Sequence, residues 1–184
     1  MSKIFSQKYS NSYGVGQIGW QKNVEKSLGI EGLISSGYIM GYKSVADDLV
    51  EECYNTALAD TYVFPIVFLY RQYIELLLKN IYFKFNSDEQ KEKIIFIRKH
   101  GHKLSKVWKK VKELMEENNY KKSDIQFIES FIKEFEKNDP NSFNFRYFVN
   151  KDFTATLPNE IYVNLLGLKE AIDKVDDILY STYG

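Results

Sequence analysis

The sequence predicts a mainly all-α fold: an up-and-down bundle of four to five helices with a small β-hairpin or extended flap near residues 143–157. Apolar residues recur at helical spacing through most of the chain beyond residue 42. Residues 143–157 differ, because Phe143, Phe145, Tyr147 and Val149 follow the two-residue period of a strand. A length of 184 residues fits one domain, so a single domain is expected over residues 1–184.

The first part of the chain, residues 1–20, shows no periodicity and is predicted to be an irregular N-terminal arm. The bundle is expected over residues 42–182, with a first helix over 42–54. The next helix, from Phe64 to about Phe85, is apolar nearly all round and is therefore expected at the centre. Pro65 suits its first turn, where the missing N–H has no partner to lose.

The second half of the chain is predicted to contain a charged connection and three further helices. Residues 86–93 form the connection, and an amphipathic helix follows over 102–117. A helix from Ser123 ends at Asp139, before Pro140. The last helix is expected from Pro158 to about Tyr180. Its apolar residues have the spacing of a seam for packing within the bundle or in a dimer: Ile161, Leu165, Leu168, Ile172, Val175 and Leu179.

Composition limits the classes of function. A net charge of zero argues against general nucleic-acid binding by the whole chain. Residues 93–112 are rich in Lys and Arg without Asp or Glu, and could either follow phosphates or form a solvated helix face. The lone Cys53 is expected to be a buried thiol in a reducing compartment. Without a signal peptide or a long apolar run, the chain is expected to be cytoplasmic, with no membrane contact.

The first candidate site is Arg71 with Glu75 in the central helix. Buried charges are costly unless they are paired, so these side chains are expected to be partnered or to face a cleft. The pair is then either a structural ion pair or an anion-binding arginine oriented by a carboxylate.

The second candidate site opens the amphipathic helix and consists of Arg98, Lys99, His100, His102 and Lys103. A helix N-terminus disfavours an imidazolium, so a histidine there could accept a proton, and the cluster could bind phosphate. The other interpretation is that His102 caps or packs the helix. Two histidines with one residue between them make a poor zinc site, and no metal or cofactor is expected.

The third candidate site is the segment 139–147, polar at first and then aromatic. As a strand it would place Arg146 and Tyr147 on opposite faces. Asp139 and Arg146 could close the loop on each other, or Arg146 could point into a cleft shared with Arg71 and His102. Elsewhere, Gly14-Val15-Gly16 lacks the third glycine and the helix of a dinucleotide-binding motif.

Three phrases carry a resemblance: Phe-Leu-Tyr-Arg-Gln-Tyr-Ile-Glu-Leu at 68–76, Gly-His-Lys-Leu-Ser-Lys-Val-Trp at 101–108, and Asp-Pro-Asn-Ser-Phe-Asn-Phe-Arg-Tyr at 139–147. With a last long helix, their order over residues 40–182 resembles the HEPN (higher eukaryotes and prokaryotes nucleotide-binding) group, especially its bacterial members of uncharacterised activity. The resemblance implies a helical bundle that is usually a homodimer. Many such proteins are metal-independent ribonucleases of toxin–antitoxin or phage-defence systems, and others bind nucleotides, RNA or a protein.

The ribonucleases of this group carry an arginine, four to six intervening residues and a histidine. This motif is not found here, because Arg98 and His102 are separated by three residues and no histidine follows Arg146.

The leading hypothesis is a HEPN-like defence or toxin-type domain that engages RNA or a nucleotide. If it cleaves RNA, His102 or His100 is the expected general base, Arg71 and Arg146 stabilise the phosphate charge, and Glu75 orients Arg71. Substrate contacts are assigned to Arg98, Lys99, Lys103, Asp139 and Tyr147.

The alternative is a non-catalytic dimeric regulatory module that holds a protein partner through the aromatic flap and the last helix. A third interpretation is a scaffold dimer without a ligand. Convergence of Arg71, His102 and Arg146 in one pocket would favour a site, and their dispersal would favour the scaffold.

Overall fold

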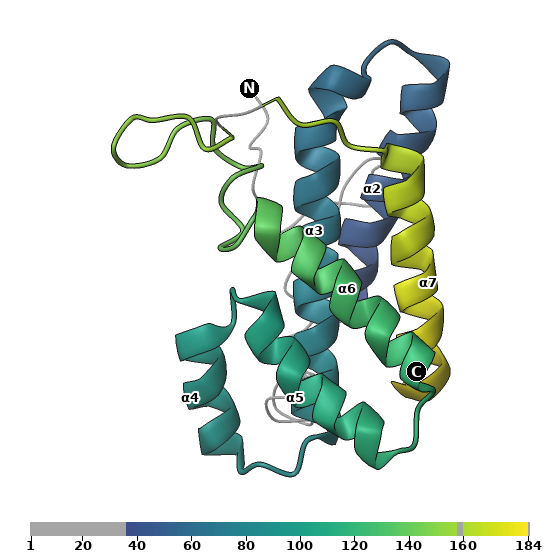
Figure 1. Cartoon of the computed structure of the whole chain (residues 1–184), viewed down its shortest axis with the longest axis vertical. Coiled ribbons are helices and arrows are strands. Elements are labelled where there is room, and N and C mark those ends of the chain that lie inside the picture. The colour runs from purple at the N-terminus through teal and green to yellow at the C-terminus, as the bar shows by residue number, and fades with distance from the viewer. Residues whose placement is uncertain (1–35, 158–159, 184) are drawn as a thin grey trace, which may run out of the picture.

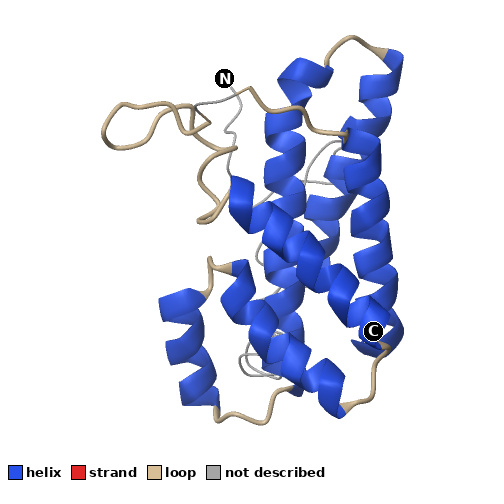
Figure 2. Cartoon of the chain, in the orientation of Figure 1, coloured by secondary structure: helices blue, strands red, loops and turns tan. Residues whose placement is uncertain are grey.

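The computed structural model of the protein describes residues 36–157 and 160–183, and this part of the chain is helical (Figure 2). It contains six helices: α2 (Ser36–Asn55), α3 (Ala59–Phe85), α4 (Gln90–His100), α5 (Leu104–Glu117), α6 (Lys122–Asn138) and α7 (Leu165–Tyr183). The helical class is therefore confirmed. The predicted arm at residues 1–20 lies outside the described residues.

Helix α3 forms the centre of the fold, as its all-round apolar pattern predicts. Figure 1 shows α2, α3 and α7 running alongside one another, with α6 crossing them obliquely and α4 and α5 at one end. Ile66, Ile74 and Leu78 are completely buried on α3. Burial of this apolar surface is the main stabilising contribution to the fold.

Three fully buried tyrosines of α3 need hydrogen-bond partners, and each finds a carboxylate on another part of the chain. The Tyr70 hydroxyl donates to Asp47 of α2 at 2.7 Å, and that of Tyr82 donates to Asp88 at 3.0 Å. The Tyr73 hydroxyl donates to Asp176 of α7. Buried phenols without such partners would be destabilising.

Three predicted boundaries in the first half of the chain are corrected, the first being that α2 begins at Ser36 instead of residue 42. Helix α3 begins at Ala59, so Pro65 lies inside the helix, where it removes one intrahelical hydrogen bond, rather than in the first turn. The segment 86–93 is only partly a connection, because α4 begins at Gln90. Helix α4 has a weak apolar stripe, with Ile94 and Phe96 half-buried and Ile95 exposed, so its periodicity is hard to recognise.

The last helix begins later than predicted. Asn164 caps α7: its side-chain oxygen accepts from the Gly167 N–H at 3.0 Å, and its carbonyl accepts from Leu168 at 2.9 Å. Ile161 therefore lies outside the helix and is exposed. The central residues of the predicted seam are completely buried in the core of the same chain, namely Ile172, Val175 and Leu179.

Of the two forms predicted for residues 143–157, a small β-hairpin or an extended flap, the hairpin is not found. The only strand-like feature of this segment is an isolated antiparallel bridge between Val149 and Ala155, and no strand occurs among residues 36–157 and 160–183. The Phe143 carbonyl accepts from the N–H groups of both Arg146 and Tyr147, which winds this segment into a turn. A positive φ of 56° at Phe153 also interrupts extended backbone.

No helix in the described ranges is long and apolar enough to cross a membrane.

Candidate functional site

The centre of the candidate site is an ion pair buried on α3. Arg71 is completely buried and Glu75 is 2% exposed. One turn of helix separates them, so Nη1 of Arg71 donates to Oε2 of Glu75 at 3.0 Å. The guanidinium is not fully satisfied, since its Nε is buried without a hydrogen-bond partner among the described residues. Pairing explains how a charged side chain is accommodated in this apolar helix.

A loop between α4 and α5 joins this pair and brings His102 to it. Nη2 of Arg71 donates to the backbone carbonyl of His102 at 2.7 Å. The His102 imidazole lies with Nδ1 3.1 Å from Oε1 of Glu75, yet its side chain is 77% exposed. Because a carboxylate only accepts hydrogen bonds, the neutral imidazole must carry its proton on Nδ1. Its Nε2 lone pair is then available to accept a proton from a ligand.

Lys79 completes the arrangement on the next turn of α3. Its Nζ donates to Oε1 of Glu75 at 2.6 Å, the same oxygen that faces His102. Arg71 and Lys79 together leave one positive charge uncompensated by Glu75. The site thus favours an anion beside the exposed imidazole.

Gly101 allows the chain to turn tightly against the end of α4, beside the Lys79 side chain of α3. A Cβ atom at this position would lie 2.6 Å from the Ile97 carbonyl oxygen and 3.1 Å from Cε of Lys79. Its φ of −62° is ordinary, so the requirement for glycine is one of space. The absence of a side chain at Gly101 therefore helps to place the next residue, His102, against Glu75.

His100 does not join this cluster. Its ring packs against Phe96 at a centroid distance of 5.3 Å, on the α4 side of the loop. Partial burial, followed by the charges of Lys99, Lys106 and Lys103, lowers the pKa of His100 below its usual value. Of the two histidines, only His102 is held by a carboxylate.

A basic rim surrounds the loop. Arg98, Lys99 and Lys103 are exposed, and none has an ion-pair partner in the described part of the chain. Unpaired surface cations near an exposed imidazole are suited to phosphate contacts. These three predicted substrate-binding residues lie within four positions of His102 in the chain and are open to solvent.

Arg146 lies farther along α3. Its guanidinium carbon is 5.6 Å from the centroid of the Phe68 ring and 5.2 Å from that of Tyr147. Phe68 precedes Glu75 by seven residues, which corresponds to about 10 Å along the helix axis. Arg146 and Tyr147 thus stack together and are exposed, instead of lying on opposite faces as a strand would place them.

Asp139 holds its own loop rather than closing onto Arg146. It is 1% exposed, and its Oδ1 accepts from the N–H groups of Phe143 at 2.6 Å and Asn144 at 3.0 Å. Gln72 of α3 donates to Ser142 of this loop at 2.7 Å. The loop carrying Arg146 is consequently tied to the same helix as Glu75.

The structure therefore joins Arg71, Glu75 and His102, and places Arg146 apart from them. The sequence places Lys79 on one polar line with Arg71 and Glu75, but neither Lys79 nor Gly101 was among the predicted site residues. The spacing of Lys79 four residues after Glu75 was a usable signal, because side chains at that separation meet on a helix. No group of three or more His, Cys, Asp or Glu side chains within the described ranges is arranged to hold a metal ion.

The chain matches no family model, no curated protein and no solved structure. The fold and site define a helical protein in which a buried arginine–glutamate pair holds an exposed histidine.

Proposed function

We propose that this chain is a HEPN-like domain of bacterial defence or toxin type that engages RNA and cleaves it without a metal ion, with His102 as general base. The observation that carries the proposal is the contact between His102 and buried Glu75, with the imidazole otherwise open to solvent. A base held by a third group within hydrogen-bond distance is the usual arrangement for proton transfer.

The proposed reaction is transfer of the phosphodiester to the neighbouring ribose hydroxyl. Nε2 of His102 removes the 2′-hydroxyl proton, and the 2′-oxygen attacks the adjacent phosphorus. The bond from phosphorus to the 5′-oxygen breaks, which leaves a 2′,3′-cyclic phosphate and a 5′-hydroxyl after protonation of the leaving oxygen. Glu75 stabilises the imidazolium that forms during the transfer.

The arginine roles differ within this proposal. Arg71 is completely buried, so it acts as a positioning residue through Glu75 and the His102 carbonyl. Stabilisation of phosphate charge is assigned to exposed Arg98, Lys103 and Arg146. Arg146 can contact a neighbouring phosphate of the RNA backbone, because it lies about 10 Å along α3 from Glu75.

The proposal includes an up-and-down bundle that forms a homodimer, as the HEPN resemblance implies, and that is located in the cytoplasm. A second copy would bring a second His102, whose imidazolium could protonate the leaving oxygen. Buried Ile172, Val175 and Leu179 belong to the core of one chain, so the dimer interface is assigned to exposed residues.

The test is incubation of the purified full chain with total RNA in the presence of EDTA. Wild type is expected to cleave, and His102→Ala is expected to reduce the rate by about 10²-fold or more. His100→Ala is the matched control and should retain cleavage, because His100 packs on Phe96. Intact RNA with wild-type protein would refute the catalytic role.

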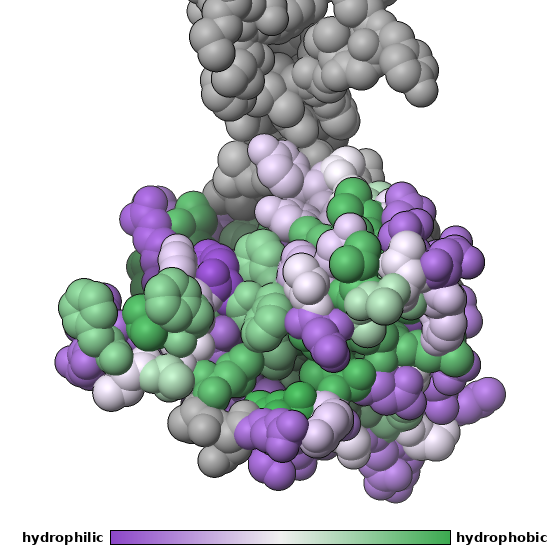
Figure 3. Space-filling view, turned by 90° about the horizontal axis from the view of Figure 1, so that it is seen from above, coloured by the Kyte–Doolittle hydropathy of each residue, from purple (hydrophilic) through white to green (hydrophobic). Residues whose placement is uncertain are grey.

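A second candidate function is that of a non-catalytic module that holds a protein partner. It is favoured by exposed aromatic residues in the segment between α6 and α7. Phe148 is 86% exposed, Phe153 is 87% exposed and Tyr162 is 86% exposed. Figure 3 shows apolar side chains gathered among hydrophilic ones at this end of the molecule. Such patches often mark protein-binding surfaces. If the chain is such a module, Phe148→Ser would abolish binding of the protein partner, and His102→Ala would leave that binding unchanged.

A further inference from the structure

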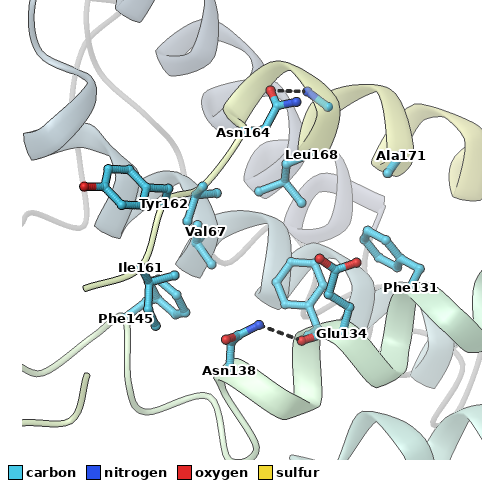
Figure 4. Close-up of a pocket in the computed structure, with 13 residues that line it drawn as sticks. Val67, Phe131, Glu134, Asn138, Phe145, Ile161, Tyr162, Asn164, Leu168 and Ala171 are labelled. Carbon is cyan, nitrogen blue, oxygen red and sulfur yellow. Dashed lines mark hydrogen bonds between the residues drawn. The ribbon is translucent and has the colours of Figure 1, made fainter. Parts of the chain in front are cut away.

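A cavity separate from the His102 site lies between α3, α6 and the beginning of α7 (Figure 4). Its volume is about 250 Å³, and its apolar wall includes Val67, Phe131, Phe135, Phe145 and Leu168. A cavity of about 150 Å³ holds benzene, so this one has room for a larger planar ring system. Aromatic walls favour a flat ligand that can stack.

Glu134 supplies a hydrogen-bond acceptor in this cavity. Figure 4 shows its carboxylate extending from α6 toward α7, among the lining residues. Glu134 is exposed, and its carboxylate has neither an ion pair nor a hydrogen bond to another side chain in the described part of the chain. Its two oxygens are therefore free to accept from a ligand with two adjacent N–H groups.

Two amides provide a further acceptor and a donor. Nδ2 of Asn138 donates to the Glu134 carbonyl at 3.0 Å, which leaves Oδ1 of Asn138 to accept. Oδ1 of Asn164 accepts from the Gly167 N–H at 3.0 Å, which leaves Nδ2 of Asn164 to donate. The cavity thus presents acceptors on the α6 side and a donor at the start of α7.

We propose that this cavity binds a guanine-type base. Guanine presents two adjacent donors, N1–H and the exocyclic amine, beside the O6 acceptor on one edge. The donors suit Glu134 and Asn138, and O6 suits Nδ2 of Asn164. Adenine lacks the adjacent pair of donors on its corresponding edge, so it cannot satisfy the carboxylate in the same way.

This inference rests on the proposed function for the source of the base, which is a guanosine in the RNA bound at the His102 site. Val67 lines the cavity and precedes Glu75 by eight residues, or about 12 Å along α3. Phe145 lines the cavity, and the next residue, Arg146, stacks on Phe68 beside cavity residue Val67, so a cation is near the cavity for a phosphate of the bound RNA. A free guanosine nucleotide would bring the same base chemistry.

The test compares the full-length wild-type chain with Glu134→Gln, and uses Glu113→Gln, an exposed glutamate of α5, as the matched control. Calorimetry measures binding of guanosine, inosine and adenosine 5′-monophosphates. Inosine lacks the exocyclic amine and should bind more weakly than guanosine. Guanosine monophosphate is expected to bind about tenfold or more tightly than adenosine monophosphate, and Glu134→Gln to remove this preference. Glu113→Gln should leave it unchanged.

A second arm distinguishes the source, using fluorescence anisotropy with short oligouridines that contain one central guanosine or adenosine. Preference for guanosine in both arms supports recognition within RNA, and preference in the mononucleotide arm alone assigns the cavity to a free nucleotide. Equal binding of guanosine and adenosine, or a preference that survives in Glu134→Gln, would overturn the proposal. If the wild-type protein cleaves RNA but shows no preference for guanosine, only the guanine-binding proposal is refuted. If it prefers guanosine but does not cleave RNA, only the proposed catalytic role is refuted.

Discussion

Nη2 of Arg71 donates a hydrogen bond to the backbone carbonyl of His102 at 2.7 Å, so a buried guanidinium holds the backbone of an exposed histidine. The same guanidinium binds Glu75, which in turn contacts the His102 ring. His102 is therefore held at two points, its backbone carbonyl by Arg71 and its imidazole by Glu75. Separate substitutions can test these two attachments.

Arg71→Ala should destabilise the fold by about 3 kcal/mol, because it removes one partner of a buried ion pair. Urea unfolding monitored by circular dichroism measures the change. The double substitution Arg71→Met/Glu75→Leu should recover part of the lost stability, since it removes both fully buried charges, although Lys79 loses its ion pair with Glu75. A double variant as unstable as the sum of both single variants would contradict this explanation.

His102→Gln should change the free energy of unfolding by less than about 0.5 kcal/mol, because the side chain is largely exposed. The same substitution should abolish RNA cleavage if His102 transfers the proton. Unfolding and cleavage assays on one preparation separate the two effects. A large loss of stability would instead assign His102 a structural role.

Gly101→Ala should destabilise the protein by about 1–3 kcal/mol and reduce cleavage, since the new Cβ would be too close to the Ile97 carbonyl. Gly41→Ala is the matched control, because a Cβ at that position of α2 has nothing within 4 Å. There, alanine should stabilise the helix by up to about 1 kcal/mol. Thermal unfolding measures the change in stability of each variant. Equal changes in Gly101→Ala and Gly41→Ala would show that the short distance to the Ile97 carbonyl is not the cause of the destabilisation.

Asp88→Asn should weaken the acid dependence of stability. The hydrogen bond from Lys110 lowers the pKa of Asp88 below its usual 3.8, with a further hydrogen bond from Tyr82. The folded state therefore binds this proton less readily, so the stabilisation is present above pH 3.8 and is lost as the pH falls through the lowered pKa. Urea midpoints at pH 7, 5 and 3 test this, with Glu117→Gln, an exposed carboxylate of α5, as control.

The sequence predicts part of the site because Arg71 and Glu75 are charged residues in an otherwise apolar helix. It does not predict what Arg71 binds on the loop, since the acceptor is a backbone carbonyl, which every residue has. The sequence leaves two positions open for Arg146, closure onto Asp139 or the cleft of His102, but its guanidinium packs on Phe68 and Tyr147 instead.

The two main errors in the fold also have local causes. Helix α4 contains charged residues on much of its surface, and the amine of buried Lys93 donates to the Phe83 carbonyl at 3.0 Å. A buried lysine weakens the apolar pattern from which helices are recognised. In the loop, the alternation of aromatic residues imitates a strand, although Phe145 alone among Phe143, Phe145 and Tyr147 is buried.

The three tyrosine–aspartate hydrogen bonds of α3 have a consequence for how its neighbours align. Apolar surfaces alone permit packed helices to slide or rotate with little change in buried area. Tyr70 and Tyr73 reach their carboxylates on α2 and α7 at only one height of these helices along α3, and Tyr82 shares Asp88 with Lys110 of α5. Slipped alignments would leave buried hydroxyls without acceptors, so these bonds select a single register of α3 against these helices.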